Sequence, residues 1–87
     1  MRRNIKFEPH AIDEFLDWML ADQKIAARIG DLLKEIGRTP FAGIGKPEPL
    51  KGNFKGYWSR RITEEHRLLY HVTDADIIII SCKGHYE

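Results

Sequence analysis

Apolar and polar residues follow strand-like and helix-like periods in the first 37 residues of this chain. Residues 4–7 alternate as a short strand does. Pro9 suits the first position of a helix, and Asp22 suits the N-cap of a second helix that Gly37 ends. The apolar stripes fall at helical spacing on Ile12, Phe15, Leu16 and Met19 in the first helix and on Ile25, Ile29, Leu32, Leu33 and Ile36 in the second. We expect both stripes to pack into the core.

Helical and strand periods are both absent from residues 38–56. Glycines and prolines interrupt this segment at Pro40, Gly43, Gly45, Pro47, Pro49, Gly52 and Gly56. An irregular segment of this length is uncommon in a small domain and is usually functional or disordered. We therefore expect residues 38–56 to form a loop that is either functional or disordered, and it contains much of the positive charge.

Three strand-like runs follow, at residues 57–62, 66–72 and 77–83, and short connections join them. Short connections favour an antiparallel meander. The order β-α-α-β-β-β then predicts an α+β fold, in which two helices pack on one face of a mainly antiparallel four- to five-stranded sheet. At 87 residues the chain is long enough for one domain, which we place at residues 1–87.

Alternation within the strand-like runs separates a helix-facing side from an open side. The apolar set predicted to meet the helices is Trp58, Ile62, Leu68, Tyr70 and Val72. Arg61 and Arg67 would then project together from the open side. The last run places four residues on one side, Ile79, Ser81, Lys83 and His85. Only the strand register can match that side to the arginines.

Composition excludes several classes of protein. The chain is 43% apolar and 31% charged, which is typical of a soluble globular protein rather than a disordered one. Its single cysteine, Cys82, cannot form an intrachain disulfide, and we expect a buried strand thiol there. No run approaches the roughly 20 apolar residues of a membrane span, and the N-terminus lacks the apolar core of a signal peptide. We therefore expect a cytoplasmic protein with no membrane association.

Positive charge is concentrated in one part of the chain, although the net charge is only +1. Residues 38–67 contain seven basic and three acidic residues, a net of +4, whereas residues 1–37 contain six basic and seven acidic residues, a net of −1. A concentrated positive segment suits a phosphate-binding surface. Charge alone agrees equally well with an ordinary solvated loop.

Three groups of residues have a chemistry that core packing does not explain. Glu48 lies between two prolines in the basic segment, Arg61 and Arg67 share the open side, and His85 and Tyr86 lie at the end of the chain. Cleavage of RNA by its own 2′-hydroxyl needs a base, a cation for the charge at phosphorus and an acid for the leaving oxygen. Glutamate, arginine and histidine supply these roles. The other histidines lack metal-site spacing, so we expect no metal and no cofactor.

Four segments carry longer motifs: residues 38–41 (RTPF), 45–51 (GKPEPLK), 56–68 (GYWSRRITEEHRL) and the terminal pair His85-Tyr86. In order and spacing these motifs resemble the YoeB/Txe toxins, a family in the RelE superfamily of type II toxin–antitoxin systems. The resemblance extends over essentially the whole chain. It implies the RelE-like microbial-ribonuclease fold and a metal-independent endoribonuclease. Such an mRNA interferase cleaves mRNA in the ribosomal A site by 2′-OH transesterification and leaves a 2′,3′-cyclic phosphate.

The same resemblance implies roles for individual residues. Glu48 falls on the family's general base, Arg67 on its phosphate-stabilising arginine and His85 on its general acid. Tyr86 falls on the terminal tyrosine of the catalytic set. The residues expected to bind RNA phosphates are Lys46, Lys51, Arg61 and Lys83. The implied partners are a YefM-type antitoxin, mRNA with the 70S ribosome, and a second copy in a homodimer, while operator DNA is bound only through the antitoxin.

Two residues depart from the family's usual ending, a basic residue and an aromatic residue followed by His-Tyr. Gly84 replaces the aromatic residue, and we expect it to loosen the tail. Glu87 adds negative charge beside the expected site.

Two other functions are compatible with a domain of this kind. The main alternative is a non-catalytic module that binds the ribosome or the antitoxin without cutting RNA. A missing base, acid or arginine would favour that alternative, and this chain has all three. A DNA-binding protein is the second alternative, although the basic recognition helix of a helix-turn-helix is not evident.

Overall fold

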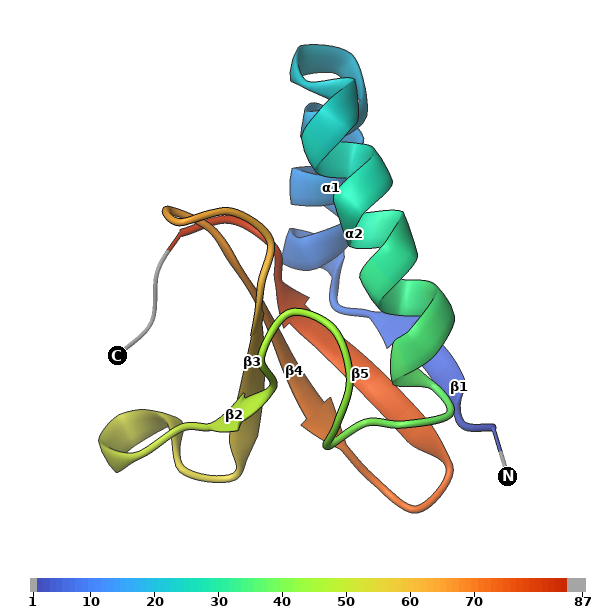
Figure 1. The fold of residues 1–87 in the computed structure, drawn as a ribbon, viewed down its shortest axis with the longest axis vertical. Coiled ribbons are helices and arrows are strands. Elements are labelled where there is room, and N and C mark those ends of the chain that lie inside the picture. The colour runs from blue at the N-terminus through green and yellow to red at the C-terminus, as the bar shows by residue number, and fades with distance from the viewer. Residues whose placement is uncertain (1, 85–87) are drawn as a thin grey trace.

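The computed structural model describes residues 2–84 as a two-layer arrangement of helices on a sheet (Figure 1). The helices are α1 (Pro9–Ala21) and α2 (Gln23–Ile36). The strands are β1 (Asn4–Phe7), β2 (Glu48–Pro49), β3 (Tyr57–Arg61), β4 (Arg67–Val72) and β5 (Asp76–Ser81). They form one sheet in the order β1-β5-β4-β3-β2, in which β1 is parallel to β5 and the other pairs are antiparallel. The predicted α+β fold, with two helices on one face of a mainly antiparallel sheet of four to five strands, is confirmed, and the sheet has five.

The segment predicted to be an irregular loop contains two short elements. Strand β2 pairs with β3 at the edge of the sheet, and the 3₁₀ turn η1 (Gly52–Phe54) follows it. The prolines on either side of Glu48 concealed this strand from the sequence pattern, because proline cannot donate a ladder hydrogen bond. An edge strand tolerates proline, since one side of that strand has no neighbour to bond. Glu48 therefore lies in the sheet rather than in a loop.

The side of α1 that faces the core differs in part from the predicted apolar stripe. Leu16 and Met19 were expected in the core, but they are 49% and 48% exposed. The buried side of α1 instead carries Ala11, Phe15 and Trp18, which also recur at helical spacing. The indole N–H of Trp18 donates to the backbone carbonyl of Cys82 at 2.9 Å, a polar contact that holds this side of α1 toward the sheet.

Helix α2 agrees with the prediction at its start and along its buried side. The carboxylate of Asp22 accepts hydrogen bonds from the N–H groups of Lys24 and Ile25 at 3.1 and 3.3 Å, which is the expected N-cap. The stripe is confirmed, with Ile29, Leu32 and Ile36 fully buried and Ile25 and Leu33 packed against the core.

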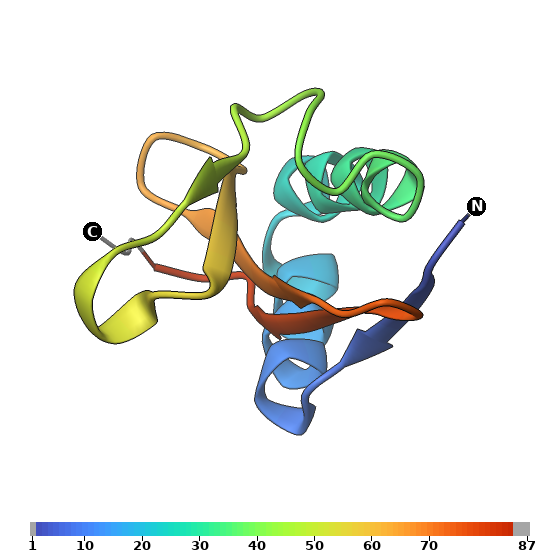
Figure 2. The ribbon, with the colours of Figure 1, turned by 90° about the horizontal axis from the view of Figure 1, so that it is seen from below.

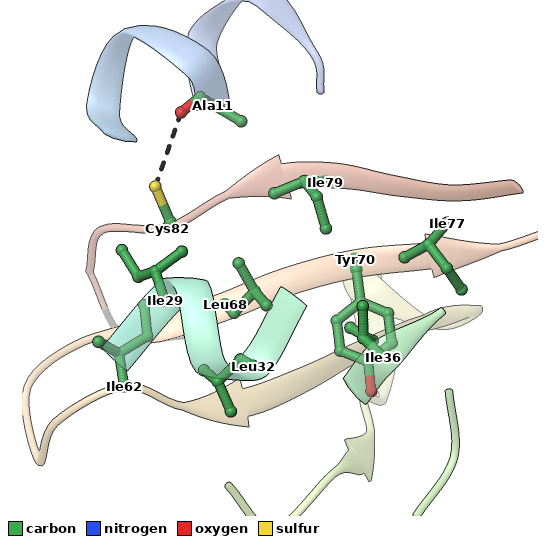
Figure 3. Packing of buried hydrophobic residues seen from close by; sticks show 10 residues of the cluster. All are labelled: Ala11, Ile29, Leu32, Ile36, Ile62, Leu68, Tyr70, Ile77, Ile79 and Cys82. Atoms are coloured by element: carbon green, nitrogen blue, oxygen red, sulfur yellow. Dashed lines mark hydrogen bonds between the residues drawn. The ribbon is translucent and has the colours of Figure 1, made fainter. Parts of the chain in front are cut away.

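The core lies between the helices and the face of the sheet that the apolar set predicts (Figure 3). Ile62, Leu68 and Tyr70 are buried, and Trp58 and Val72 pack against them. Cys82 is a buried thiol, as expected, and donates to the carbonyl of Ala11. Burial raises the pKa of the Cys82 thiol to about 12, so the sulfur stays protonated and is a poor nucleophile. Within residues 2–84, neither helix is long and apolar enough to cross a membrane.

Candidate active site

The strand register places the predicted base and both predicted arginines on one face of the sheet. Glu48 pairs with Ser59 and Ser59 with Leu69, while Arg61 pairs directly with Arg67. Side chains of directly opposed residues point to the same face, and so do side chains two residues apart along a strand. Glu48, Arg61 and Arg67 therefore share the face turned away from the helices. The predicted pairing of the two arginines is confirmed.

This face is less open than the alternation predicts. Leu69 lies on it between Arg67 and His71, yet Leu69 is only 2% exposed and its neighbour Ser59 is also buried. Glu48 and Arg61 are exposed, and Arg67 is partly buried. The polar residues of this face thus lie around the buried side chains of Leu69 and Ser59.

The pairing of β5 with β4 contains a bulge, which the sequence could not locate. Leu69 pairs with Ser81 and Tyr70 with Ile79, so Ile80 is an extra residue on β5. Beyond it, Ser81 turns toward α1, where its hydroxyl donates to the carboxylate of Glu14 at 2.9 Å. The side that Ile79 shares with Ser81 is therefore the helix side, and it does not match the face of Arg61 and Arg67.

Glu48 is held in place by backbone bonds on both sides of its two-residue strand. The N–H of Arg61 donates to the carbonyl of Gly45 at 2.7 Å, and the N–H of Leu50 donates to the carbonyl of Tyr57 at 2.9 Å. The chain enters β2 through Gly45 and Lys46, whose φ angles are +82° and +50°. The carboxylate of Glu48 is exposed between two rigid prolines, as a base that meets an external substrate must be.

A buried arginine that the sequence interpretation missed organises the chain ahead of β2. Arg60 is fully buried, and its guanidinium forms an ion pair of 2.7 Å with Glu35 of α2. The guanidinium also donates to the backbone carbonyls of Thr39, Ala42 and Ile44. One side chain thus satisfies three carbonyls of the irregular segment that leads to Glu48.

Two further groups complete the network around Arg60. Its Nε donates to the hydroxyl of Tyr70 at 3.2 Å, and that hydroxyl donates to the carbonyl of Pro40 at 2.7 Å. Burial raises the pKa of Tyr70, so the hydroxyl stays a neutral donor. The hydrogen bond from Arg60 lowers the pKa of Glu35, whose carboxylate also accepts from the N–H of Ile44. Arg60 shares its strand parity with Trp58 and Ile62, and that parity was the signal of its burial.

Arg67 reaches the turn that joins β3 to β4. Its Nη1 donates to the carbonyls of Thr63, Glu64 and His66. Within residues 2–84, its Nε and Nη2 have no hydrogen-bond partner. Among the described residues the guanidinium is thus anchored by one nitrogen, and the edge formed by the other two has the fork geometry that suits two phosphate oxygens.

The remaining predicted residues divide into three groups. Lys46 and Lys51 are exposed on either side of β2 and so flank Glu48. Lys83 lies against α1, with its Nζ 5.7 Å from the centre of the Trp18 ring. His85 and Tyr86 lie outside the described residues. Among residues 2–84, no group of three or more His, Cys, Asp or Glu side chains is arranged to hold a metal ion.

Gly84 lies beside Arg67 and is bonded through both of its backbone groups. Its carbonyl accepts from the N–H of Arg67 at 2.8 Å, and its own N–H donates to Nδ1 of His66 at 3.0 Å. Gly84 itself is therefore fixed, whereas the tail that it was expected to loosen lies outside the described residues. Its φ of +95° is one that glycine adopts readily and other residues rarely do.

The chain is similar to known proteins over nearly its whole length. A family model described as the YoeB-like toxin of bacterial type II toxin–antitoxin systems matches residues 7–86. Toxin RelK of Mycobacterium tuberculosis is 51% identical over 84 residues, which are 97% of this chain and 99% of the relative. The YoeB dimer from Staphylococcus aureus superposes with a TM-score of 0.89 at 49% identity, covering 99% of this chain and 100% of the other. The YoeB–YefM complex from the same organism gives 0.87 at 48% identity, with the same coverage.

Proposed function

The chain belongs to the YoeB-like toxins of bacterial type II toxin–antitoxin systems, and from this membership we propose that it is a ribosome-dependent endoribonuclease. Its substrate is mRNA in the ribosomal A site, and the reaction is attack of the RNA's own 2′-hydroxyl on the adjacent phosphate. The observation that supports this most directly is the strand register, because it places a carboxylate and two guanidinium groups on one face.

The proposed reaction assigns one role to each group. Glu48 removes the proton of the 2′-hydroxyl, and the 2′-oxygen forms a bond to phosphorus. Arg67 stabilises the negative charge that develops on the phosphate oxygens, which is often the larger part of such catalysis. The bond from phosphorus to the 5′-oxygen breaks, and His85 protonates that oxygen. The products are a 2′,3′-cyclic phosphate and a 5′-hydroxyl, with no net oxidation and no added water.

The basic residues around the site bind the RNA backbone in this proposal. Arg61 lies beside Arg67 on the same face, and Lys46 and Lys51 flank Glu48. Lys83 extends the basic set toward α1. Tyr86, at the position of the family's terminal tyrosine, completes the catalytic set.

The substrate test uses mRNA with a single 2′-deoxy sugar at the cut site, on programmed ribosomes with no metal beyond what keeps them assembled. We expect that substitution to abolish cleavage at that bond, whereas a deoxy sugar two nucleotides away should leave it intact. Full cleavage of the deoxy substrate would exclude attack by the 2′-hydroxyl.

The residue test compares Glu48→Gln with Asp74→Asn, which removes an exposed carboxylate from the turn between β4 and β5. We expect about a 10²–10⁴-fold loss of cleavage for Glu48→Gln, the usual contribution of a general base, and no loss for Asp74→Asn. Arg67→Lys should also fail, because an ammonium cannot bind two phosphate oxygens as a planar fork does. Wild-type cleavage by Glu48→Gln would exclude Glu48 as the general base, whereas no cleavage by the unmodified protein would favour the non-catalytic binding module.

The proposed partners are a YefM-type antitoxin and a second copy of this chain. The Staphylococcus aureus relatives, which form a YoeB dimer and a YoeB–YefM complex, support this proposal. A disordered antitoxin segment that folds over the basic residues should bind with a strongly negative heat-capacity change in calorimetry. A change near zero would indicate a small rigid contact instead. Operator DNA, in this proposal, is bound through the antitoxin.

A further inference from the structure

The segment that follows β5 is fixed by polar contacts with α1. The carboxylate of Glu14 accepts hydrogen bonds from the hydroxyl of Ser81 at 2.9 Å and from the N–H of Cys82 at 2.8 Å. The indole N–H of Trp18 donates to the carbonyl of Cys82. Both backbone groups of Cys82 are therefore satisfied by α1, and the chain is fixed up to that residue.

A second contact holds the chain two residues later. The N–H of Gly84 donates to Nδ1 of His66, while the carbonyl of Gly84 accepts from the N–H of Arg67. His66 can accept at Nδ1 only in the neutral form with its proton on Nε2. The imidazole packs edge-on against the indole of Trp18, with ring centroids 4.8 Å apart. Trp18 thus contacts both the carbonyl of Cys82 and the ring that holds Gly84. Figure 2 shows the chain after β5 passing the helices before it ends.

We propose that His66 is a positioning residue, which fixes Gly84 beside Arg67 and so sets the starting point of the residues that follow it. The proposal rests on the proposed function, in which the next residue, His85, protonates the leaving oxygen while Arg67 holds the phosphate. His66 touches neither substrate nor leaving group in this scheme. It acts through the backbone of Gly84, and its partner in holding that backbone is the N–H of Arg67.

Fold formation alone does not require this contact. The last buried apolar residue before Gly84 is Cys82, and α1 already satisfies both backbone groups of that residue. The hydrogen bond from Gly84 to His66 therefore adds order to the chain beyond the core. A misplaced catalytic group reduces the rate by as much as about 10²-fold for a shift of roughly 1 Å, so the consequence should fall on the chemical step.

Two substitutions of His66 distinguish the effect of the hydrogen-bond acceptor at Nδ1 from the effect of the imidazole ring. In His66→Asn the side-chain oxygen occupies the position of Nδ1 and can accept from Gly84, whereas in His66→Gln the amide reaches the position of Nε2. Both variants lose the ring that packs on Trp18. We expect His66→Gln to lower kcat about 10- to 100-fold with KM nearly unchanged, and His66→Asn to recover most of the loss. Equal losses in the two variants, or wild-type kcat in His66→Gln, would overturn the proposal.

The leaving group gives a readout that a general loss of folding would not move. In an mRNA with sulfur in place of the 5′-oxygen at the cut bond, the leaving group is a thiolate. A thiolate departs without being protonated, so cleavage of this substrate does not need a general acid. The defect of His66→Gln should largely disappear on this substrate. A defect of the same size on both substrates would show that His66 does not act through the acid.

Amide hydrogen exchange tests the structural step without any cleavage assay. The amide of Gly84 should exchange at least about 10-fold faster in His66→Gln than in the wild type, because its acceptor is gone, and at a near wild-type rate in His66→Asn. An unchanged exchange rate of the Gly84 amide in His66→Gln would overturn this inference and leave the proposed function standing. A wild-type protein that cleaves the 2′-deoxy mRNA would overturn the proposed function and leave the anchoring of Gly84 standing.

Discussion

Replacing Arg60 with methionine should be among the most destabilising single substitutions in this chain. Methionine keeps much of the length of the side chain and removes the charge and all of its donors. The ion pair with Glu35 is lost, and the carbonyls of Thr39, Ala42 and Ile44 lose their donor. The segment that leads to Glu48 then loses the hydrogen bonds that Arg60 donates to it from β3.

The expected magnitude follows from the burial of the two partners. Removing one member of a buried ion pair costs about 3–5 kcal/mol, because the other charge is left without compensation. Glu35 is 32% exposed and can regain part of its hydration, which favours the lower limit of about 3 kcal/mol. A domain of 87 residues has a free energy of unfolding of about 4–13 kcal/mol. The substitution should therefore remove a large share of the stability and lower Tm by about 12–24 °C, at roughly 4–8 °C per kcal/mol.

Urea unfolding, followed by tryptophan fluorescence and circular dichroism, measures this loss. Arg61→Met is the matched control, since it removes an adjacent, exposed arginine from the opposite face of β3, and it should change stability by no more than about 0.5 kcal/mol. The double variant Glu35→Gln/Arg60→Met should lose less than the sum of the two single variants, because they share one interaction. If Arg60→Met unfolds within about 1 kcal/mol of the wild type, the reasoning about the buried pair is wrong.

Four further predictions follow from individual residues. Since the pKa of Glu35 is lowered in the folded state, the folded protein binds fewer protons than the unfolded one. The contribution of Glu35 to stability should be complete above the ordinary glutamate pKa and lost as the pH falls through the folded pKa. In urea titrations, the free energy of unfolding should therefore decrease less on acidification in Glu35→Gln than in the wild type. Gly45→Ala should lower stability by about 1–3 kcal/mol in the same assay, because φ is +82° and the added methyl would lie 2.9 Å from Leu32 Cδ2. The thiol of Cys82, with a pKa raised to about 12, should react with a disulfide reagent only in urea. A chain that ends at Gly84 should keep a wild-type Tm while mRNA cleavage drops by at least about 10²-fold.

The apolar periods predicted the elements that are built by apolar packing. Helix α2 and the inward residues of β3 and β4 follow the hydrophobic pattern because burial of those side chains holds them in place. For α1 the pattern was right for Phe15, which packs against the core, and wrong for Leu16 and Met19, which are spaced as regularly as Phe15 and Trp18. Periodicity alone does not distinguish these two faces, and the polar contacts of Glu14 and Trp18 with Cys82 favour the second.

The same limit applies to the candidate site. Strand alternation placed Arg61 and Arg67 together because antiparallel neighbours repeat every two residues. It also placed Arg60 on the helix-facing side, where a charge is acceptable only with a partner. The partner is Glu35, 25 positions earlier in the chain, and no local pattern links the two residues. The bulge at Ile80 is equally invisible to alternation, because it shifts the pairing without changing the residue types.

The two sides of the proposed site are held by a common physical arrangement. Irregular segments have carbonyl and N–H groups with no ladder partner, and buried groups of this kind must be satisfied by something else. Here side chains from neighbouring elements do so, with Arg60 bonding the segment before Glu48 and His66 bonding Gly84. Apolar packing buries the first segment only in part, since Phe41 and Ile44 are 50% and 40% exposed. Because Arg60 is buried with a charged partner and His66 lies at the edge of the core, the same kind of contact has different consequences. Loss of Arg60 should reduce stability and activity together, whereas loss of the His66 acceptor should reduce the rate of cleavage while the fold persists.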